Sequence, residues 1–316
     1  MKNIHTPVLT KEVLQYLNPK PNENFIDATI GEAGHAIEIL EKSKPDGRLL
    51  GIDLDPEQIE NSRLITDSFK ERIILVNDSY VNLKEIVEKI NFKPVHGILL
   101  DLGYSSWQLE QSKRGFSFSK DEILDMRYNM QSILTAEKII NEYPKAQIEK
   151  ILQDYGQEHF ARQIANKISE QRKIKKIQST FQLKAVIEKA IPPKFRHGKI
   201  NFATRTFQAL RIAVNEELNN LAKVLPDAVS VLSPGGRLVV ISFHSLEDRI
   251  VKMFFKQIEK EGIIYPVKSS QSKVSRKAGQ FNRVKILTPK PVMATSEEVL
   301  INARSRSAKL RALYKI

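Results

Sequence analysis

Asp53 and two glycines upstream of it, Gly31 and Gly34, form the first pattern in the sequence that suggests chemistry. The glycines lie in a turn between a predicted strand and a predicted helix, where a ligand can approach the backbone and the helix start offers free N–H donors. Asp53 ends the next predicted strand about twenty residues later, and a carboxylate there can accept hydrogen bonds from both hydroxyls of an adenosine ribose. The pattern predicts a nucleotide-type cofactor. In the structural alternative the turn is only a tight connection and Asp53 caps a helix, although Asp55 is better placed for that cap.

Two cofactors, NAD and S-adenosylmethionine, fit a site of this kind. The turn lacks the third glycine of the full dinucleotide fingerprint, and nothing downstream resembles a hydride-transfer site. The segment Asn77–Tyr80 follows the third predicted strand and could place a carboxylate, an amide or a ring beside an adenine. These features favour S-adenosylmethionine, and a nicotinamide-dependent oxidoreductase is the rival enzyme.

Asp101 ends the fourth predicted strand and begins the segment Asp101–Leu109. Ligands of open parallel sheets bind beyond the carboxyl ends of the strands, so this segment is expected to face the reactive end of the cofactor. A carboxylate there could accept a hydrogen bond from an exocyclic amine and direct its lone pair at a methyl group, while Tyr104 or Trp107 could stack on a base. The structural alternative is that Asp101 only caps the next helix.

The order of the predicted elements supplies a scaffold that brings strand ends together. Short apolar runs alternate with helical patterns over roughly the first hundred residues, and one more strand pattern follows a Pro-Gly-Gly turn. The predicted strands are 24–28, 48–53, 72–76, 95–101 and 236–243. Strand–helix alternation with short connections predicts a parallel sheet with helices on both faces. Between about Thr135 and Leu225 apolar residues recur at helical spacing, which predicts a helical insertion.

The composition narrows the partners and the compartment. Lys and Arg number 50 against 37 Asp and Glu, a net charge of +13, and residues 265–316 hold twelve basic and two acidic residues. Such a segment suggests a polyanion, most simply nucleic acid, against the alternative of a solvated tail. The chain has no cysteine, which excludes disulfides, thiolate zinc sites and a cysteine nucleophile, and we expect no metal. With no apolar run near the ~20 residues of a membrane span and no signal-peptide pattern, a cytoplasmic location without a membrane partner is expected.

The basic residues form two candidate phosphate-binding clusters. The first consists of Arg172, Lys173, Lys175, Lys176, Lys194, Arg196 and Lys199, and the second of Arg304, Arg306, Lys309 and Arg311. Phosphate contacts position RNA without reading its sequence. Arg205 and Arg211 could line an RNA channel or be structural. His244, just beyond the last predicted strand, could contact RNA or be a hydrogen-bonded structural residue.

Longer motifs run through nearly the whole chain. They are His5–Leu9, Gly31–His35, Asp101–Ser106 with Gln108, Arg114–Phe118, Asp125–Arg127, Arg205–Asn215, Ser242–Asp248 and Asn302–Arg311. With these motifs the sequence resembles the bacterial ribosomal RNA small subunit methyltransferase H family, also called MraW. The resemblance implies an α/β fold, a Rossmann-like class I methyltransferase sheet with an inserted all-helical domain. Residues 1–108 and 226–316 would form the S-adenosylmethionine-binding domain, and residues 109–225 a helical insertion that recognises RNA.

The resemblance also implies the reaction, which is methylation by S-adenosyl-L-methionine of the exocyclic N4 of a cytidine, position 1402, in the decoding centre of 16S rRNA. The cofactor contacts that it implies are Ala33, Gly34, His35, Asp53, Tyr80, Asp101 and Gln108. Asp101 would orient the amine, helped by a backbone carbonyl or hydroxyl of Tyr104, Ser105 or Ser106. The sequence departs from the family at Ala33, where Gly is usual, at Trp107, where Pro is expected, and at Tyr80, where Phe is common. These departures concern the shape of the base pocket and not the reaction.

Direct transfer to nitrogen agrees with the missing cysteine, since methylation at C5 of cytosine ordinarily uses a cysteine nucleophile. The target base is normally stacked or paired, so we expect it to be flipped into the pocket near Asp101. The expected partner is 16S rRNA in the small ribosomal subunit, and the sequence leaves a homodimer open. A second rival is a non-catalytic rRNA-binding assembly factor that keeps only the fold of a cofactor enzyme.

Overall fold

Two units make up the chain. The computed structural model describes residues 7–198, 200–261 and 283–316, so Lys199, the start of the His5–Leu9 motif and residues 262–282 lie outside the described residues. The first unit, here called the sheet unit, consists of Met1–Gly103 and Leu218–Ile316, and the second, the helical unit, of Tyr104–Glu217. Their boundaries fall five and eight residues before the predicted ones at 108 and 225.

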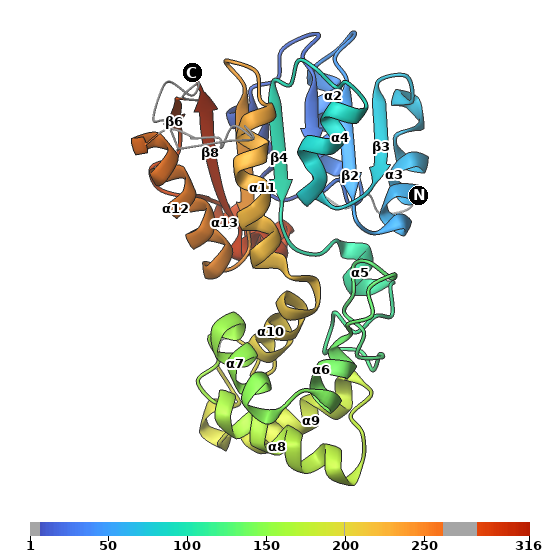
Figure 1. Ribbon diagram of the computed structural model, residues 1–316, viewed down its shortest axis with the longest axis vertical. Coiled ribbons are helices and arrows are strands. Elements are labelled where there is room, and N and C mark those ends of the chain that lie inside the picture. The colour runs from blue at the N-terminus through green and yellow to red at the C-terminus, as the bar shows by residue number, and fades with distance from the viewer. Residues whose placement is uncertain (1–6, 199, 262–282) are drawn as a thin grey trace, which may run out of the picture. The chain divides into compact units, whose positions relative to one another are not determined.

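Parallel strands form the centre of the sheet unit (Figure 1). They are β1 (Phe25–Asp27), β2 (Leu49–Asp53), β3 (Ile73–Asn77), β4 (Gly97–Asp101) and β5 (Arg237–Ser242). The strand order is β3-β2-β1-β4-β5-β8-β6, and β1 to β5 are parallel to one another. The chain runs outward from β1 to β3 and then returns to place β4 on the other side of β1, so the order reverses between β1 and β4. This doubly wound α/β sheet confirms the predicted Rossmann-like methyltransferase fold.

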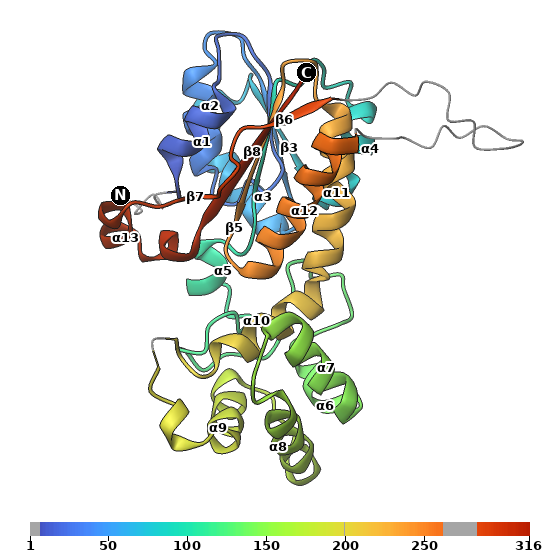
Figure 2. The ribbon, with the colours of Figure 1, turned by 90° about the vertical axis from the view of Figure 1, so that its left-hand side faces the viewer.

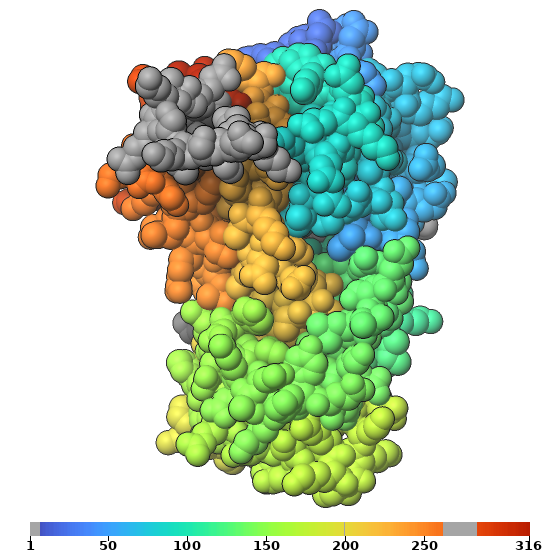
Figure 3. Space-filling model, viewed as in Figure 1, coloured from blue at the N-terminus to red at the C-terminus, as the bar shows by residue number. Residues whose placement is uncertain are grey.

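Alternate residues of these strands face two hydrophobic cores, as the two-residue period of a strand requires. Ile26, Leu50 and Ile98 belong to one core, and their neighbours Leu49 and Leu99 belong to the other. The first core is covered by α4 (Leu83–Lys89), α11 (Glu217–Val231) and α12 (Ser245–Glu261). The second is covered by α1 (Thr10–Leu17), α2 (Gly34–Lys42) and α3 (Pro56–Ile65). α11 and α12 lie side by side on the face seen in Figure 3. Because helices cover both faces of the sheet, ligands are expected at the carboxyl edge of the strands.

The helical unit has a hydrophobic core of its own, in which Ile148, Leu152, Ile164 and Ile168 are fully buried. Its helices are α5 (Ser106–Glu110), α6 (Ala136–Glu142), α7 (Lys145–Gly156), α8 (Ala161–Ile174), α9 (Thr180–Ala190) and α10 (Thr204–Asn215). Short 3-10 turns occur in both units at Asp67–Phe69, Tyr80–Asn82, Pro193–Phe195 and Ala303–Ser307. Among the described residues, no helix has the length and apolar character that crossing a membrane would require.

The C-terminal basic segment forms part of the sheet, which the sequence patterns did not predict. β8 (Lys309–Lys315) pairs antiparallel with β5 on one side (Figure 2). On its other side it pairs with two short strands, β6 (Val284–Ile286) and β7 (Val292–Met293). The short helix α13 (Ser296–Ile301) lies between β7 and β8 in the chain. Part of the segment expected to act as a basic surface is therefore built into the sheet, and its described basic residues Arg311 and Lys315 are buried.

Arg311 shows how this placement changes the role of a basic residue. Its side chain is 7% exposed, and its Nε donates to Oδ1 of Asp248 at 2.6 Å. Lys309 lies 3.7 Å from the same carboxylate and is 29% exposed, whereas Arg306 is exposed. Lys315 is also buried, where its Nζ donates to main-chain carbonyls at the end of α11. The expectation that Arg311 contacts phosphate is wrong, because its guanidinium is buried against Asp248.

We expect Arg311→Met to lower the free energy of unfolding by roughly 2–3 kcal/mol, because it removes the main partner of a largely buried carboxylate. The loss stays at the low end for such pairs because Lys309 is still near Asp248. The matched control, Arg306→Met, changes an exposed residue and should cost less than about 0.5 kcal/mol. Urea unfolding followed by far-UV circular dichroism measures both. Equal effects of the two variants would show that the Arg311–Asp248 pair does not stabilise the sheet.

Candidate functional site

The turn between β1 and α2 adopts a left-handed backbone at two residues. Gly31 has φ +49° and Ala33 has φ +59°. The turn is held from two sides, since Gly31 N donates to Asp53 Oδ2 at 3.0 Å and Ser62 Oγ donates to Gly31 O at 2.6 Å. A left-handed residue that carries a Cβ costs roughly 1–2 kcal/mol. Glycine would avoid this strain at position 33, so the Ala33 departure noted in the sequence has a local energetic cost.

The start of α2 presents unpaired N–H donors at the sheet edge. Ala33 is the N-cap residue, and no side chain accepts a hydrogen bond there. The first N–H groups of the helix, those of Gly34, His35 and Ala36, have no acceptor within the helix. These donors and the helix dipole suit a carboxylate or another anionic group of a ligand.

Asp53 lies at the end of β2 and binds the glycine turn through its carboxylate. Oδ2 accepts from Gly31 N, and Oδ1 accepts from Asp55 N at 2.9 Å. Burial raises the pKa of Asp53 to about 6. Asp55, and not Asp53, caps α3, because its carboxylate accepts from Glu57 N at 3.2 Å. A carboxylate has about four lone-pair sites, so Asp53 can still accept hydrogen bonds from a ligand.

Asp101, at the end of β4, is tied to the same turn through its backbone. Its N–H donates to Thr29 Oγ1 at 2.7 Å. Its Oδ1 is buried without a hydrogen-bond partner, and its Oδ2 lies 3.5 Å from Nε2 of His35. The alternative that Asp101 caps the next helix is wrong, because Ser105 caps α5. The carboxyl group of Asp101 is therefore available to a ligand.

Asp27 and His35 complete the buried group beside Asp101. Asp27 is 1% exposed, and burial raises its pKa to about 7, with Asp101 and Asp53 adding to the rise and His35 and the Thr29 N–H opposing it. The imidazole of His35 is 5% exposed, and neither ring nitrogen makes a hydrogen bond. Three carboxyl groups with one basic neighbour at a sheet edge favour a positively charged ligand.

Tyr80 follows β3 and packs on the core that α4 covers. It opens the 3-10 turn Tyr80–Asn82 and is half-buried. The residues before it are fixed to the neighbouring strand, since Asp78 N and Asn77 Nδ2 both donate to Asp53 O, at 3.1 and 3.0 Å. Tyr80 thus follows the strand next to the one that ends at Asp53. From the sequence, this segment was predicted to contact the base of the cofactor.

The remaining predicted site residues, Tyr104, Ser105 and Gln108, belong to the helical unit. Ser105 and Gln108 form a capping box at the start of α5. Gln108 N donates to Ser105 Oγ at 3.1 Å, and Ser105 N donates to Gln108 Oε1 at 3.0 Å. The spacing Ser-x-x-Gln is the sequence signature of such a cap. Both side chains therefore have a structural role, which sequence reasoning missed.

Tyr104 carries a partly exposed ring with one cation and one aromatic ring beside it. The ring is 39% exposed, and the guanidinium of Arg211 lies 4.8 Å from its centroid. Phe116 lies 6.1 Å from Tyr104, centroid to centroid, and stacks on Tyr128 at 5.4 Å. Arg211 is itself 10% exposed and binds Glu217 through two hydrogen bonds of 2.9 and 3.0 Å. Arg211 is thus a structural residue that supports Tyr104. The sequence left open whether Arg211 lines an RNA channel or is structural, and these contacts favour the structural role.

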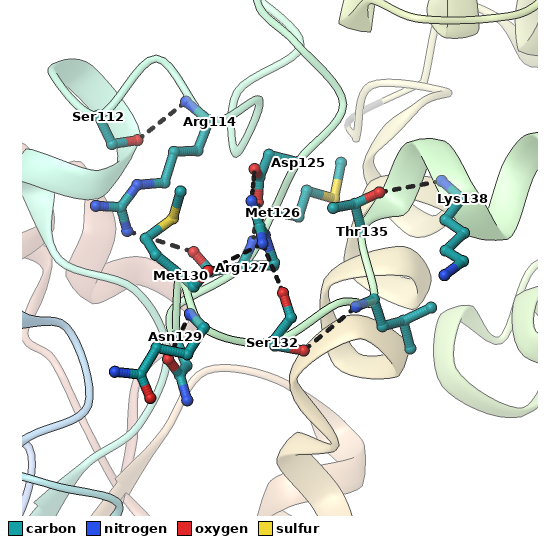
Figure 4. Close-up of polar contacts among 12 residues, drawn as sticks. Ser112, Arg114, Asp125, Met126, Arg127, Asn129, Met130, Ser132, Thr135 and Lys138 are labelled. Carbon is teal, nitrogen blue, oxygen red and sulfur yellow. Dashed lines mark hydrogen bonds and ion pairs between the residues drawn. The ribbon is translucent and has the colours of Figure 1, made fainter.

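The motif Asp125–Arg127 holds a loop of the helical unit (Figure 4). Arg127 donates through Nε and Nη2 to the Asp125 carboxylate at 2.8 and 2.7 Å. Its Nη1 donates to the carbonyls of Met130 and Ser132 at 3.1 and 2.5 Å. The Asp125 hydrogen bond, with the charge of that carboxylate, raises the pKa of Arg127. Arg127 therefore donates to four acceptor atoms across the loop. These bonds help the loop, which has no regular secondary structure, to keep one conformation.

His244 is positioned by Glu247 at the start of α12. Glu247 is 2% exposed, and its Oε2 accepts from Phe243 N at 2.8 Å and from His244 N at 3.3 Å. In return, Glu247 N donates to His244 Nδ1 at 3.5 Å. Nε2 of His244 lies 3.2 Å from Glu247 Oε1 without hydrogen-bond geometry. These contacts favour the structural interpretation of His244. The sequence signal for it is Glu247 at the third position of the helix, where a glutamate commonly caps the helix start.

Comparison with known proteins identifies close relatives over the full length. The family model described as the MraW methylase family matches residues 2–316. A protein named ribosomal RNA small subunit methyltransferase H from Heliobacterium mobile is 44% identical over 313 residues, which cover 99% of each chain. One of the same name from Dehalococcoides mccartyi is 45% identical over 312 residues, covering 99% of this chain and 86% of that one.

Solved structures are similar at a lower level. One is described as an rRNA methylase from Streptococcus thermophilus, with a TM-score of 0.42 and 9% identity over 97% of this chain and 93% of the other. A score below 0.5 is too low to establish a shared fold, so the fold assignment depends on the strand order given above.

The raised pKa of Asp27 predicts a pH dependence of stability. The folded chain keeps a proton on this carboxyl up to a pH of about 7, whereas the ordinary value is 3.8. The folded state therefore binds more protons in this window, so the free energy of unfolding falls as the pH rises from about 4 to 7, at roughly 1 kcal/mol per pH unit. Asp27→Asn should remove the contribution of Asp27 and leave that of Asp53, whose pKa is also raised, whereas the exposed Asp46→Asn should leave the whole slope, as measured by urea unfolding across the window. Parallel curves for wild type and Asp27→Asn would contradict the assignment.

Arg127→Lys keeps the charge but loses the planar fork that binds several acceptors at once. We expect it to lower the free energy of unfolding of the helical unit by roughly 1–3 kcal/mol and to make the loop more sensitive to protease, because Asp125 and two carbonyls lose donors. Limited proteolysis with mass mapping locates the new cuts. The control is Lys138→Arg on α6, which should leave the pattern unchanged. An unaltered cleavage pattern in Arg127→Lys would show that the loop does not depend on this residue.

Proposed function

Because the chain belongs to the MraW methylase family, we propose that it transfers a methyl group to the exocyclic N4 of a cytidine in the decoding centre of 16S rRNA. The methyl donor of this family is S-adenosylmethionine, the cofactor that the sequence predicted. The ribosomal substrate comes from the names of its relatives, and the choice of an exocyclic amine rests on the resemblance and on the carboxyl group of Asp101.

The residues of the sheet unit fit a cationic nucleoside cofactor. Asp53 would accept hydrogen bonds from the ribose hydroxyls, and the N–H groups at the start of α2 would bind the carboxylate of the methionine part. The carboxyl groups of Asp27 and Asp101 would offset the positive charges. The proposed cofactor contacts of this unit are Ala33, Gly34, His35, Asp53, Tyr80 and Asp101, and Gln108 of the helical unit stays a proposal from the sequence alone.

The observation that carries the proposal is the free Oδ1 atom of Asp101, buried at the end of β4 with no hydrogen-bond partner. A buried acceptor without a partner costs about 1–3 kcal/mol, a cost that an N–H donor of the substrate would remove. An amine that donates one hydrogen to this oxygen has its nitrogen oriented by the protein.

The chain itself then contributes orientation and proton acceptance. The bound cofactor supplies an electrophilic methyl group, so a strong base is not required. Asp101 would accept a hydrogen bond from N4 and take the proton that the nitrogen gives up as it gains the methyl carbon. Tyr104 and Ser105, three and four residues further along the chain, would help to place the base. Thr29 holds the backbone of Asp101, and His35 lies beside its carboxylate.

The charge of the helical unit supports RNA as the substrate. It holds twenty Lys and Arg residues against thirteen Asp and Glu, a net charge of +7. Some of these cations are structural, since Arg172 donates to the carbonyls of Ile140 and Tyr143. Lys173, Lys175 and Lys176 are exposed and without such bonds, so they would contact phosphate. Ribosomes are assembled in the cytoplasm, where we place the protein.

The deciding experiment is nucleoside analysis by mass spectrometry of 16S rRNA from cells with and without the gene. We expect N4-methylcytidine to disappear without the gene and to return when purified protein and S-adenosylmethionine are added to small subunits. Undiminished N4-methylcytidine in the deletion strain would refute the proposal. A non-catalytic assembly factor would fail the in vitro step, and a nicotinamide enzyme would bind NAD in calorimetry.

Asp101→Ala should reduce kcat by roughly 100-fold or more, because the amine loses its acceptor and its orientation. RNA affinity should stay nearly unchanged, as measured by filter binding beside single-turnover methylation. The exposed Asp46→Ala in the same unit serves as the control and should keep full activity. Near-normal turnover of Asp101→Ala would show that the carboxyl group does not have this role.

A further inference from the structure

Phe195 presents half of its ring to solvent on a short loop of the helical unit. It is 51% exposed, and a single exposed apolar side chain is common on protein surfaces, so its neighbours decide whether it can bind a ligand. Its ring lies 5.2 Å from that of Phe160, centroid to centroid, and the two planes are inclined by 50°. Phe160 is partly buried against the core of the helical unit. The exposed ring is thus supported from within the unit.

The loop that carries Phe195 holds it in place before any ligand binds. Pro192 and Pro193 restrict the backbone, and Phe195 ends the 3-10 turn Pro193–Phe195. Phe195 N donates to Pro192 O at 2.9 Å, and Arg196 Nε donates to Ile191 O at 2.9 Å. A ring ordered in advance costs a ligand little entropy on binding.

The charge around Phe195 is mainly positive, with one acidic neighbour, since Glu188 Oε1 lies 3.8 Å from Arg196 Nη1. No acidic residue occurs between Glu188 and Glu216, while that stretch contains Lys189, Lys194, Arg196, Lys199, Arg205 and Arg211. The Nζ atom of Lys194 lies 5.0 Å from the centre of the Phe195 ring. Lys194 is exposed, so its ammonium can move from the ring to a phosphate. An aromatic face flanked by cations matches the combination by which proteins bind single-stranded nucleic acid.

We propose that Phe195, supported by Phe160 and flanked by Lys194 and Arg196, is a stacking platform for an unpaired nucleotide of the RNA substrate. This inference rests on the proposed function for the identity of the RNA. The nucleotide is unpaired because a duplex covers the faces of its bases, and its recognition tolerates any base because each has a π face. Lys194 contacts its phosphate, and Arg196, anchored to the loop, contributes a second positive charge that Glu188 offsets in part. The platform would bind substrate at a position separate from the reacting base.

The test measures binding of the full chain to two probes, a 12-nucleotide single-stranded oligocytidine RNA and a 12-base-pair RNA duplex, by fluorescence anisotropy. Phe195→Ala should weaken single-strand binding by about 5- to 150-fold, the effect of losing one stacked base, and change duplex binding by less than about threefold. Phe195→Trp should retain binding. Lys194→Gln should reduce the slope of log affinity against log salt by about 0.7.

Ile174→Ala is the matched control, because Ile174 is an 83% exposed apolar residue of the same unit and has no part in the platform. An unchanged unfolding midpoint shows that each variant is folded. Single-strand binding of Phe195→Ala within twofold of wild type overturns the inference. Equal losses on both probes overturn it as well, because they indicate a general loss of RNA affinity and not the loss of a stacked base. Methylation by the wild-type chain is measured separately, so a failure of the proposed function is distinguishable from a failure of the platform.

Discussion

The position of β1 between β2 and β4 is the constraint on which the site depends. β1 is only three residues long, yet Phe25–Asp27 pairs with Leu49–Gly51 on one side and with Gly97–Leu99 on the other. The carboxyl ends of three strands consequently meet at one edge of the sheet. The turn after β1 is then bound to both neighbours, to β2 through Gly31 and Asp53 and to β4 through Thr29 and Asp101.

This arrangement gathers groups that oppose folding. Three carboxyl groups lie at this edge, and burial is the main cause that raises the pKa of Asp27 to about 7 and that of Asp53 to about 6, with the neighbouring carboxyl groups adding to the rise at Asp27. Ala33 adds left-handed strain at the same place. Sites that bind charged ligands commonly carry such unfavourable features, which the rest of the fold and the ligand offset. In the helical unit the paired Arg127 and Arg211 have the opposite effect, since each satisfies a carboxylate and stabilises its surroundings.

The tertiary structure also divides the excess of positive charge into two kinds. Arg127, Arg211 and Arg311 bind carboxylates, and Lys315 binds main-chain carbonyls. Among the exposed lysines of the helical unit, Lys167 and Lys120 also have such partners, whereas Lys173 and Lys194 have none among the described residues. The net charge of +13 is therefore a poor guide to the size of an RNA-binding surface, because a cation satisfied inside the protein contributes little to counterion release.

The sequence by itself determined the groups available for chemistry and the elements that carry them. Strands β1 to β5 were predictable because each is an apolar run bounded by turn residues, and Asp55 as a helix cap because Pro56 follows it. β6, β7 and β8 were not, because they lie in a segment whose basic residues suggested a binding surface and not a sheet. Ser105 and Gln108 were assigned to the site although their spacing indicates a capping box. Only the tertiary structure decided which carboxyl groups are buried and which cations are paired. Burial and pairing depend on neighbours far apart in the chain, as Arg311 and Asp248 are, and no local pattern records them.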